Sequence, residues 1–265
     1  MSKGIFMRNK FDQQLKNLND EMIQMGMMIE ENIQKAIDAL VKKDVTLAKE
    51  IMEKDVLIDK KQRDIEGICF HLLIQQQPVA KDLRAITAAM KMVTDMERIG
   101  DHAADISEIT IMLAQVGKKD LETGHSDLRE TKDSSMKEND VANYSYQTIL
   151  RMASEASVML IKSIDAFTQR DEKKAKEVID HDDVVDALFC QAKTELIDLI
   201  RREPKYGEQQ LDMLMIAKYL ERIGDHATNI AEWVIYSLDN SGKTNVKVCK
   251  EMKLTNWVDK NNQLN

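Results

Sequence analysis

The sequence predicts an all-α protein built from two tandem, pseudo-repeated three-helix bundles, with six long helices. Three observations support this fold class. The 265 residues include only two Pro and nine Gly, too few for the tight turns of a sheet protein of this size. Apolar residues make up 43%, enough to build a core and too many for a disordered chain. The segment 97–103, ERIGDHA, also recurs unchanged at 221–227.

The duplication sets the order of the elements. The two ERIGDHA segments lie 124 residues apart, and residues 37–59 match residues 164–186 in pattern at a spacing of 127. In the first copy we predict helices over 8–42, 45–76 and 79–116. In the second copy we predict helices over 143–169, 172–202 and 208–239.

Turn residues separate these helices. Lys43-Asp44 and Arg170-Asp171 are polar pairs between the first and second helix of each copy. Pro78 and Pro204 lie between the second and third helices, because proline fits a first helical turn but breaks a helix interior. Long helices with short connections should pack antiparallel.

Four segments follow from this organisation. The first bundle is predicted over 1–117 and the second over 143–240. The segment 118–142 is rich in charged residues, with Gly and Ser and no apolar period, so we interpret it as a linker. The segment 241–265 is a C-terminal tail to which we assign no structure.

Charge and composition exclude several classes of protein. A net charge of -8 gives no broad attraction for phosphate backbones, so we expect no nucleic-acid partner. No segment approaches the ~18 apolar residues of a membrane span, and the N-terminus lacks an apolar signal core. The three Cys, at 69, 190 and 249, lack CxxC spacing, which indicates a reducing compartment. We therefore expect a soluble, cytoplasmic protein.

Acidic residues lie within the apolar stripes of the second and third helix of each copy. A helix turns by about 100° per residue, which places Glu97 and Asp101 on the face of Met90 and Val93. The other pairs lie in the same way relative to their own apolar neighbours. The candidate metal ligands are Asp55, Asp59, Glu97 and Asp101 in the first copy, and Asp182, Asp186, Glu221 and Asp225 in the second.

Four carboxylates brought together repel one another, and each is costly to desolvate. Either several take up protons with a raised pKa, or cations fill the space between them. Oxygen ligands suit Mg²⁺, Mn²⁺, Ca²⁺ and iron, and Zn²⁺ is also compatible. We predict metal ions, of the Fe, Zn, Mn or Mg type, in each bundle. The alternative is that the carboxylates lie at the edge of the stripe and pair with Arg98, Arg222 or Lys193.

The ERIGDHA segment makes two further predictions. Gly100 and Gly224 each cost about 1 kcal/mol of helix propensity relative to Ala, which indicates close approach of a neighbouring helix. His102 and His226 lie about 140° from the glutamates. We therefore interpret both histidines as structural or surface groups rather than as metal ligands.

Several motifs typical of phosphate-binding, hydrolytic and zinc proteins do not occur in the sequence. It has no Gly-rich phosphate loop, GxSxG elbow, HExxH or zinc finger. Redox di-iron bundles use Glu-x-x-His, but here Gly100 and Gly224 occupy the fourth position of that motif. We therefore expect no enzyme. The alternatives are a metal-dependent bundle enzyme, hydrolytic or redox, and a scaffold with no bound ion.

The segments 97–103, 221–236 and 76–84 (QQPVAKDLR) resemble the PhoU family. The resemblance implies a cytoplasmic negative regulator of phosphate uptake and of the phosphate-starvation two-component response. It implies contacts with the ATPase subunit of the phosphate ABC transporter and with the phosphate-sensing histidine kinase, through which the protein is peripheral to the membrane. It also implies a homodimer and metal clusters at the eight acidic positions named above. The second copy departs from the family pattern, since REPKY at 202–206 replaces QQPVA.

Overall fold

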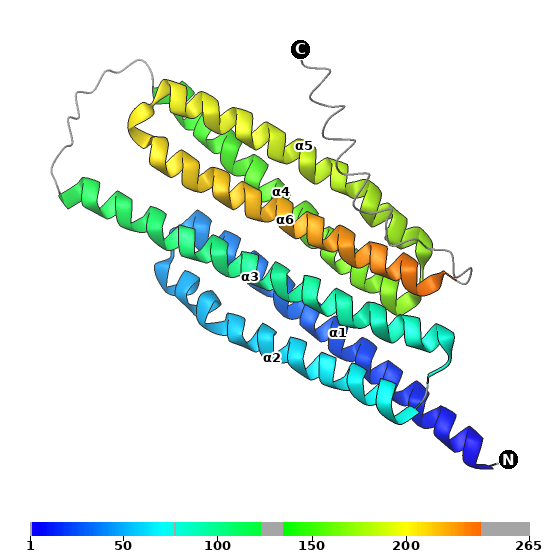
Figure 1. Cartoon of the computed structure of the whole chain (residues 1–265). Coiled ribbons are helices and arrows are strands. Elements are labelled where there is room, and N and C mark those ends of the chain that lie inside the picture. Colours follow the sequence, from blue (N-terminus) through cyan, green and yellow to red (C-terminus); the bar gives the residue numbers. More distant parts are fainter. Residues whose placement is uncertain (1, 77, 123–134, 240–265) are drawn as a thin grey trace.

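The computed structural model describes residues 2–76, 78–122 and 135–239, and these segments contain α-helices and one short 3₁₀ helix but no strand (Figure 1). The all-α prediction is confirmed. The first repeat contains α1 (Ser2–Lys42), α2 (Val45–Gln76) and α3 (Ala80–Glu122). The second contains α4 (Ser135–Gln169), α5 (Glu172–Arg202), the 3₁₀ helix η1 (Pro204–Tyr206) and α6 (Gly207–Leu238). None of the described helices combines the length and apolarity that a membrane crossing requires.

The helices of each repeat pack on one another, and the two repeats lie side by side (Figure 1). The contact between the repeats is made by α3 against α6, α1 against α4 and no other helix pair in the described part of the chain. The helices α2 and α5 contact only elements of their own repeat, so one side of each faces away from the molecule. The ERIGDHA helices α3 and α6 therefore lie at the centre of the fold.

The helices on either side of the predicted linker are longer than predicted. Residues 118–122 continue α3 and residues 135–142 belong to α4, so only 123–134 of the predicted linker lie outside the described residues. Backbone hydrogen bonds in a helix are local, and Lys, Glu and Met are good helix formers, so helices extend beyond their apolar stripe. For the same reason α1 begins before the predicted residue 8. The predicted tail, 241–265, lies outside the described residues.

One continuous apolar core runs through both repeats. In α1 it includes Met22, Met25, Ile29 and Ile33, at the i, i+3, i+7 and i+11 spacing of a helix face. Their full burial agrees with the use of methionine as a filler of irregular space in long helical cores. Burying each such side chain stabilises the fold by about 1.5–3 kcal/mol before other costs.

Both predicted turns between first and second helices have the same backbone conformation. Lys43 and Arg170, at equivalent positions of the two repeats, have φ values of 53° and 56°. These left-handed residues end α1 and α4, and the next amide donates back to the helix, from Asp44 N to Ala39 O at 2.9 Å and from Asp171 N to Ala166 O at 2.8 Å.

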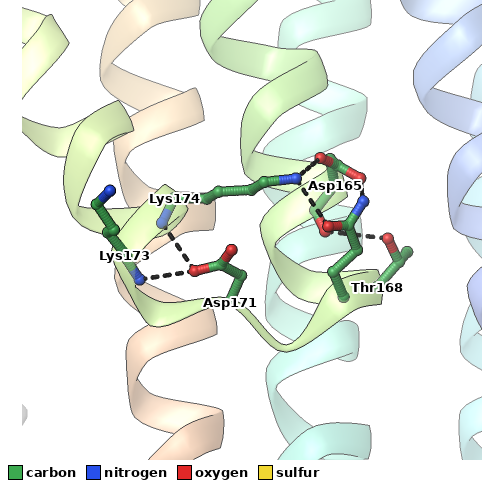
Figure 2. A network of polar contacts seen from close by, with 6 residues as sticks. Asp165, Thr168, Asp171, Lys173 and Lys174 are labelled. Atoms are coloured by element: carbon green, nitrogen blue, oxygen red, sulfur yellow. Dashed lines mark hydrogen bonds and ion pairs between the residues drawn. The ribbon is translucent and has the colours of Figure 1, made fainter.

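Each turn leads into a capped helix. Asp171 accepts hydrogen bonds from the backbone amides of Lys173 (3.0 Å) and Lys174 (3.1 Å), as Figure 2 shows. The Lys174 Nζ reaches back to Asp165 Oδ2 of α4 at 2.5 Å, which links the two helices across the turn. Asp44 caps α2 in the same way, through the amides of Thr46 and Leu47, both at 3.0 Å. The caps fix where the second helix starts, and so which of its residues face the third.

Candidate metal centre

Three carboxylates of the first repeat converge between α2 and α3. One oxygen each of Asp55, Asp59 and Asp101 lie within 4.8 Å of one another, and all three side chains are half-buried. Asp55 and Asp59 are one turn apart on α2, and Asp101 is on the facing turn of α3. Glu97 lies one turn before Asp101 and is also half-buried. The structure thus brings together the three aspartates predicted for this site.

The electrostatics of this cluster are unfavourable without a counter-charge. Burial, followed by the negative charges of Asp101, Asp59 and Glu97, raises the pKa of Asp55 from 3.8 to about 6. Burial, followed by neighbouring carboxylates, also raises the pKa values of Glu97 and Asp101. Several negative charges therefore share a partly dehydrated space.

A buried oxygen at this site has no hydrogen-bond donor. The Oδ1 atom of Asp55 is buried and has no hydrogen-bond partner. An unsatisfied buried acceptor costs about 1–3 kcal/mol. A cation with oxygen ligands would satisfy this atom and reverse the repulsion among the three carboxylates. The residues present in the first repeat therefore fit a divalent metal ion.

Gly100 allows α2 and α3 to approach at this point. A Cβ atom added to Gly100 would lie 3.6 Å from the Asp55 Oδ1 and 2.9 Å from the Ile58 Cδ1. The close helix contact predicted from this glycine is confirmed, and it is the contact that carries the carboxylate cluster. Gly224 lies in the same way against Asp182, at 3.6 Å from its Oδ1.

The second set of acids is arranged differently. Asp182 and Asp186 on α5 and Glu221 and Asp225 on α6 are all half-buried, as predicted. In the ranges that the structure describes, however, no second group of three acids meets the distance limit that the first group satisfies.

A lysine binds the glutamate of the second set. The Lys218 Nζ lies 2.5 Å from the Glu221 Oε2 and 5.2 Å from the centre of the Phe189 ring of α5. Burial raises the pKa of Glu221, and the hydrogen bond from Lys218 acts against that rise. The partner of Glu221 is thus Lys218, which the sequence analysis missed. The sequence does contain a signal for this lysine. At the 124-residue spacing Lys218 aligns with Thr94, so a charged residue in the second copy replaces a neutral one in the first.

The two repeated histidines lie between the repeats. His226 Nδ1 is 2.8 Å from Asp95 Oδ1 of α3, and Asn229 Nδ2 donates to the same oxygen at 3.2 Å. His102 is buried and stacks on Tyr219 of α6, with ring centres 5.3 Å apart. Of the two roles predicted for these histidines, the structural one is therefore correct, and the surface one is wrong for His102.

His102 contributes to this contact as a neutral group. Its Nδ1 is 3.1 Å from Asp105 Oδ2 on the same helix. Burial lowers the pKa of His102 more than the hydrogen bond to Asp105 raises it. An uncharged ring suits a position stacked on Tyr219 in the contact between α3 and α6.

The fold and the site define a class of protein: a duplicated helical bundle with an oxygen-rich cluster between two helices of its first repeat. A family model described as the PhoU domain matches residues 22–110 and 149–234, one match in each repeat. The chain therefore belongs to the PhoU family.

Individual proteins support this membership. A Clostridium acetobutylicum protein named phosphate-specific transport system accessory protein PhoU homolog is 37% identical, over 86% of this chain and 94% of its own length. A protein with the same name from Borreliella burgdorferi is 30% identical over 90% of this chain and 99% of its own.

Solved structures share the fold. The crystal structure of PhoU from Pseudomonas aeruginosa aligns with a TM-score of 0.72 at 31% identity, and covers 86% of this chain and 98% of that one. The phosphate transport system regulatory protein PhoU from Streptococcus pneumoniae aligns with a TM-score of 0.68 at 27% identity, and covers 89% of this chain and 100% of that one.

Proposed function

We propose that this protein is a negative regulator of phosphate uptake and of the phosphate-starvation two-component response. The observation that carries the proposal is the similarity, over both repeats, to proteins named as accessory to a phosphate-specific transport system. The regulator acts in the cytoplasm through contacts with the ATPase subunit of the phosphate ABC transporter and with the sensor histidine kinase. These contacts make it peripheral to the membrane, and it works as a dimer.

The outer face of α2 supports a role in protein contacts. Four large apolar side chains on it are 38–78% exposed and lie within about 40° of one another around the helix; they are Met52, Val56, Phe70 and Ile74. The equivalents of Val56 and Ile74 on α5 are Asp183 and Arg201, which are both exposed. Exposed apolar stripes of this kind are typical of protein interaction surfaces. We therefore place partner binding on α2, which contacts no element of the other repeat.

Metal binding at the carboxylate cluster would regulate the position of this apolar surface. Asp55, Asp59 and Asp101 would hold a divalent cation or iron, and the bound ion would neutralise the charges that push α2 and α3 apart. Asp59 falls about 20° from Met52 around α2, so the cluster borders the apolar stripe. A ligand that binds only the folded arrangement stabilises it by mass action. Metal occupancy would thus determine how stably α2 packs against α3 while the apolar stripe of α2 is available to a partner.

We assign no catalytic activity to the protein, since its relatives are named as accessory proteins. The alternative, a hydrolytic or redox enzyme that uses the same carboxylates, makes a distinct prediction. The purified, metal-loaded protein would turn over phosphoesters or consume O₂, and Asp101→Ala would abolish that activity. We expect neither reaction above the rate of the metal in buffer.

The regulatory proposal is tested by co-purification with the transporter ATPase from cells grown in high phosphate. We expect the two proteins to purify together, and deletion of the gene to release phosphatase expression in high phosphate. Phe70→Asp should weaken the interaction at least about tenfold, because it puts a charge into the apolar contact. Ile197→Asp, at the equivalent position of α5, is the matched control and should leave the interaction intact. The proposal fails if the ATPase does not co-purify and phosphatase expression is unchanged.

A further inference from the structure

We propose that the two carboxylate sets hold different cations: a divalent metal ion in the first repeat, and the ammonium group of the chain's own Lys218 in the second. The inference rests on the metal centre proposed above. It places a metal ion in the first repeat alone. It replaces the expectation of metal ions in both bundles, and so removes Asp182, Asp186, Glu221 and Asp225 from the set of metal ligands.

The donor geometry differs between the repeats. Oxygens of Asp55, Asp59 and Asp101 come within 4.8 Å of one another, close enough for a single ion to contact all three. Within the described segments, Asp182, Asp186 and Asp225 form no such group. The first aspartate of each set is placed alike, since Gly100 and Gly224 both lie 3.6 Å, measured from an added Cβ, from the equivalent aspartate oxygen. The charges that the neighbouring side chains bring to the two sets are not alike.

One side chain that differs between the two sets, and that brings a charge to the second, is at the position of Thr94 and Lys218. In the first repeat the hydroxyl of Thr94 donates to its own helix, to Met90 O at 3.3 Å, and brings no charge to the cluster. In the second repeat Lys218 extends to Glu221, with Nζ 2.5 Å from Oε2. The Glu221 side chain is only 14% exposed, whereas the Lys218 side chain is 39% exposed, so the carboxylate is shielded while the lysine remains accessible to water.

A second contact holds the lysine in place. Its Nζ lies 5.2 Å from the centre of the Phe189 ring, within the range of a cation–π interaction. Phe189 belongs to α5, so the amino group connects α5 with α6, as a metal ion would connect α2 with α3. The position equivalent to Phe189 in the first repeat is Gln62, which has no aromatic ring.

A metal ion entering the second set would meet the Lys218 ammonium. It would have to displace that group from Glu221, or bind beside a like charge. Both options weaken metal binding, while the first set offers an oxygen of Asp55 with no partner. The α5–α6 contact then stays independent of metal supply, and the α2–α3 contact responds to it.

The experiment measures Mn²⁺ bound per chain in the full-length protein, by elemental analysis after equilibrium dialysis at limiting Mn²⁺. We expect Asp101→Asn to weaken Mn²⁺ binding at least about tenfold, as loss of a ligand does. Asp225→Asn, the equivalent change in the second repeat, should leave the bound Mn²⁺ at the wild-type value. Equal loss in both variants would overturn the inference and leave the proposed cation centre intact. If the wild-type protein binds no Mn²⁺, both this inference and the proposed cation centre are overturned. The regulatory function would still be tested separately, by co-purification with the ATPase.

Exchange of the two side chains gives a second, independent test. Lys218→Thr should increase the Mn²⁺ bound per chain. Combining Lys218→Thr with Asp225→Asn should remove this additional Mn²⁺. Thr94→Lys should reduce the Mn²⁺ bound by the first set. Lys218→Arg keeps the charge and should bind the same amount of Mn²⁺ as the wild type. Circular dichroism at each dialysis endpoint confirms that the variants are helical. Unchanged Mn²⁺ content in both exchange variants would contradict the role assigned to Lys218.

Discussion

Gly100 of α3 lies so close to Ile58 of α2 that a methyl group at position 100 would stand 2.9 Å from the Ile58 Cδ1 and 3.0 Å from its Cγ2. The equivalent methyl at Gly224 would lie 3.4 Å from the nearest atom of Val185, an ordinary van der Waals contact. The two repeats thus share the glycine but differ in how tightly it is packed.

This difference predicts opposite effects of alanine at the two glycines. Gly100→Ala should lower the free energy of unfolding by about 1–2 kcal/mol, because overpacking against Ile58 exceeds the gain in helix propensity. Gly224→Ala should raise it, by up to about 1 kcal/mol, because the added methyl finds room. Urea unfolding of the metal-free proteins measures both. Equal effects of the two changes would contradict the packing difference.

The raised pKa of Asp55 predicts how the stability of the metal-free protein depends on pH. The folded chain favours the protonated carboxyl, so the destabilising effect of Asp55 is absent below about pH 3.8, grows as pH rises towards about 6, and is fully present above that pH. Asp55→Asn should therefore stabilise the metal-free protein at pH 7.5, with a gain that shrinks towards pH 4. Solvent screening at this half-buried site limits the gain to about 1 kcal/mol.

Thermal melts in chelator at the two pH values measure this effect. Glu53→Gln is the matched control, since it removes an exposed acid from the same helix outside the carboxylate cluster. Saturating Mn²⁺ should reverse the order of wild type and Asp55→Asn, because only the wild type keeps the full ligand set. A gain for Asp55→Asn that does not change with pH would count against a raised pKa.

The left-handed turns predict two stabilising substitutions. Lys43 and Arg170 have φ values of 53° and 56°, a conformation that costs side-chain-bearing residues about 1–2 kcal/mol. Lys43→Gly and Arg170→Gly should each stabilise the protein, by a net ~0.5–1 kcal/mol once the greater freedom of glycine in the unfolded chain is included. Lys42→Gly, at the last residue of α1, should instead destabilise, by less than about 1 kcal/mol. The urea midpoint distinguishes the two signs.

The contact between the repeats predicts a large effect at Asp95. One oxygen of this side chain, which is 15% exposed, accepts from Asn229 and pairs with His226. Asp95→Ala should cost about 1–3 kcal/mol, because two partly buried groups of α6 lose their acceptor. Asp38→Ala removes an exposed pair with Lys42, 3.4 Å long, and should cost less than about 0.5 kcal/mol. Equal costs by urea unfolding would show that the Asp95 contact does not hold the repeats together.

Much of the fold could be predicted because the relevant signals are local. Period-3.6 patterns and the duplicated segment predict six helices, and six of the predicted ends coincide with observed ones, at Lys42, Val45, Gln76, Gln169, Glu172 and Arg202. The polar pairs at 43–44 and 170–171 are the turns. The extension of α3 to Glu122 was missed because helix continuation in a polar segment leaves no apolar period.

The site was predicted less completely. The angular position of a carboxylate on its helix follows from counting residues, so the inward direction of Asp55, Asp59 and Asp101 was predicted correctly. The position of the end of a long side chain cannot be obtained by counting residues along the helix. Lys218 is three residues before Glu221, and whether its amino group meets that carboxylate or extends into water depends on the space beside Phe189 of another helix.

The sequence by itself determined the duplication, the helices and the face on which each acid lies, because these depend on interactions between residues near one another in the chain. Only the tertiary structure decided that α3 and α6 lie at the centre of the fold and that His226 contacts Asp95. It also decided that three carboxylates converge in the first acid set, and that the glutamate of the second set pairs with a lysine ammonium group. Those outcomes depend on distances between separate helices, which are set by the packing of side chains far apart in the sequence.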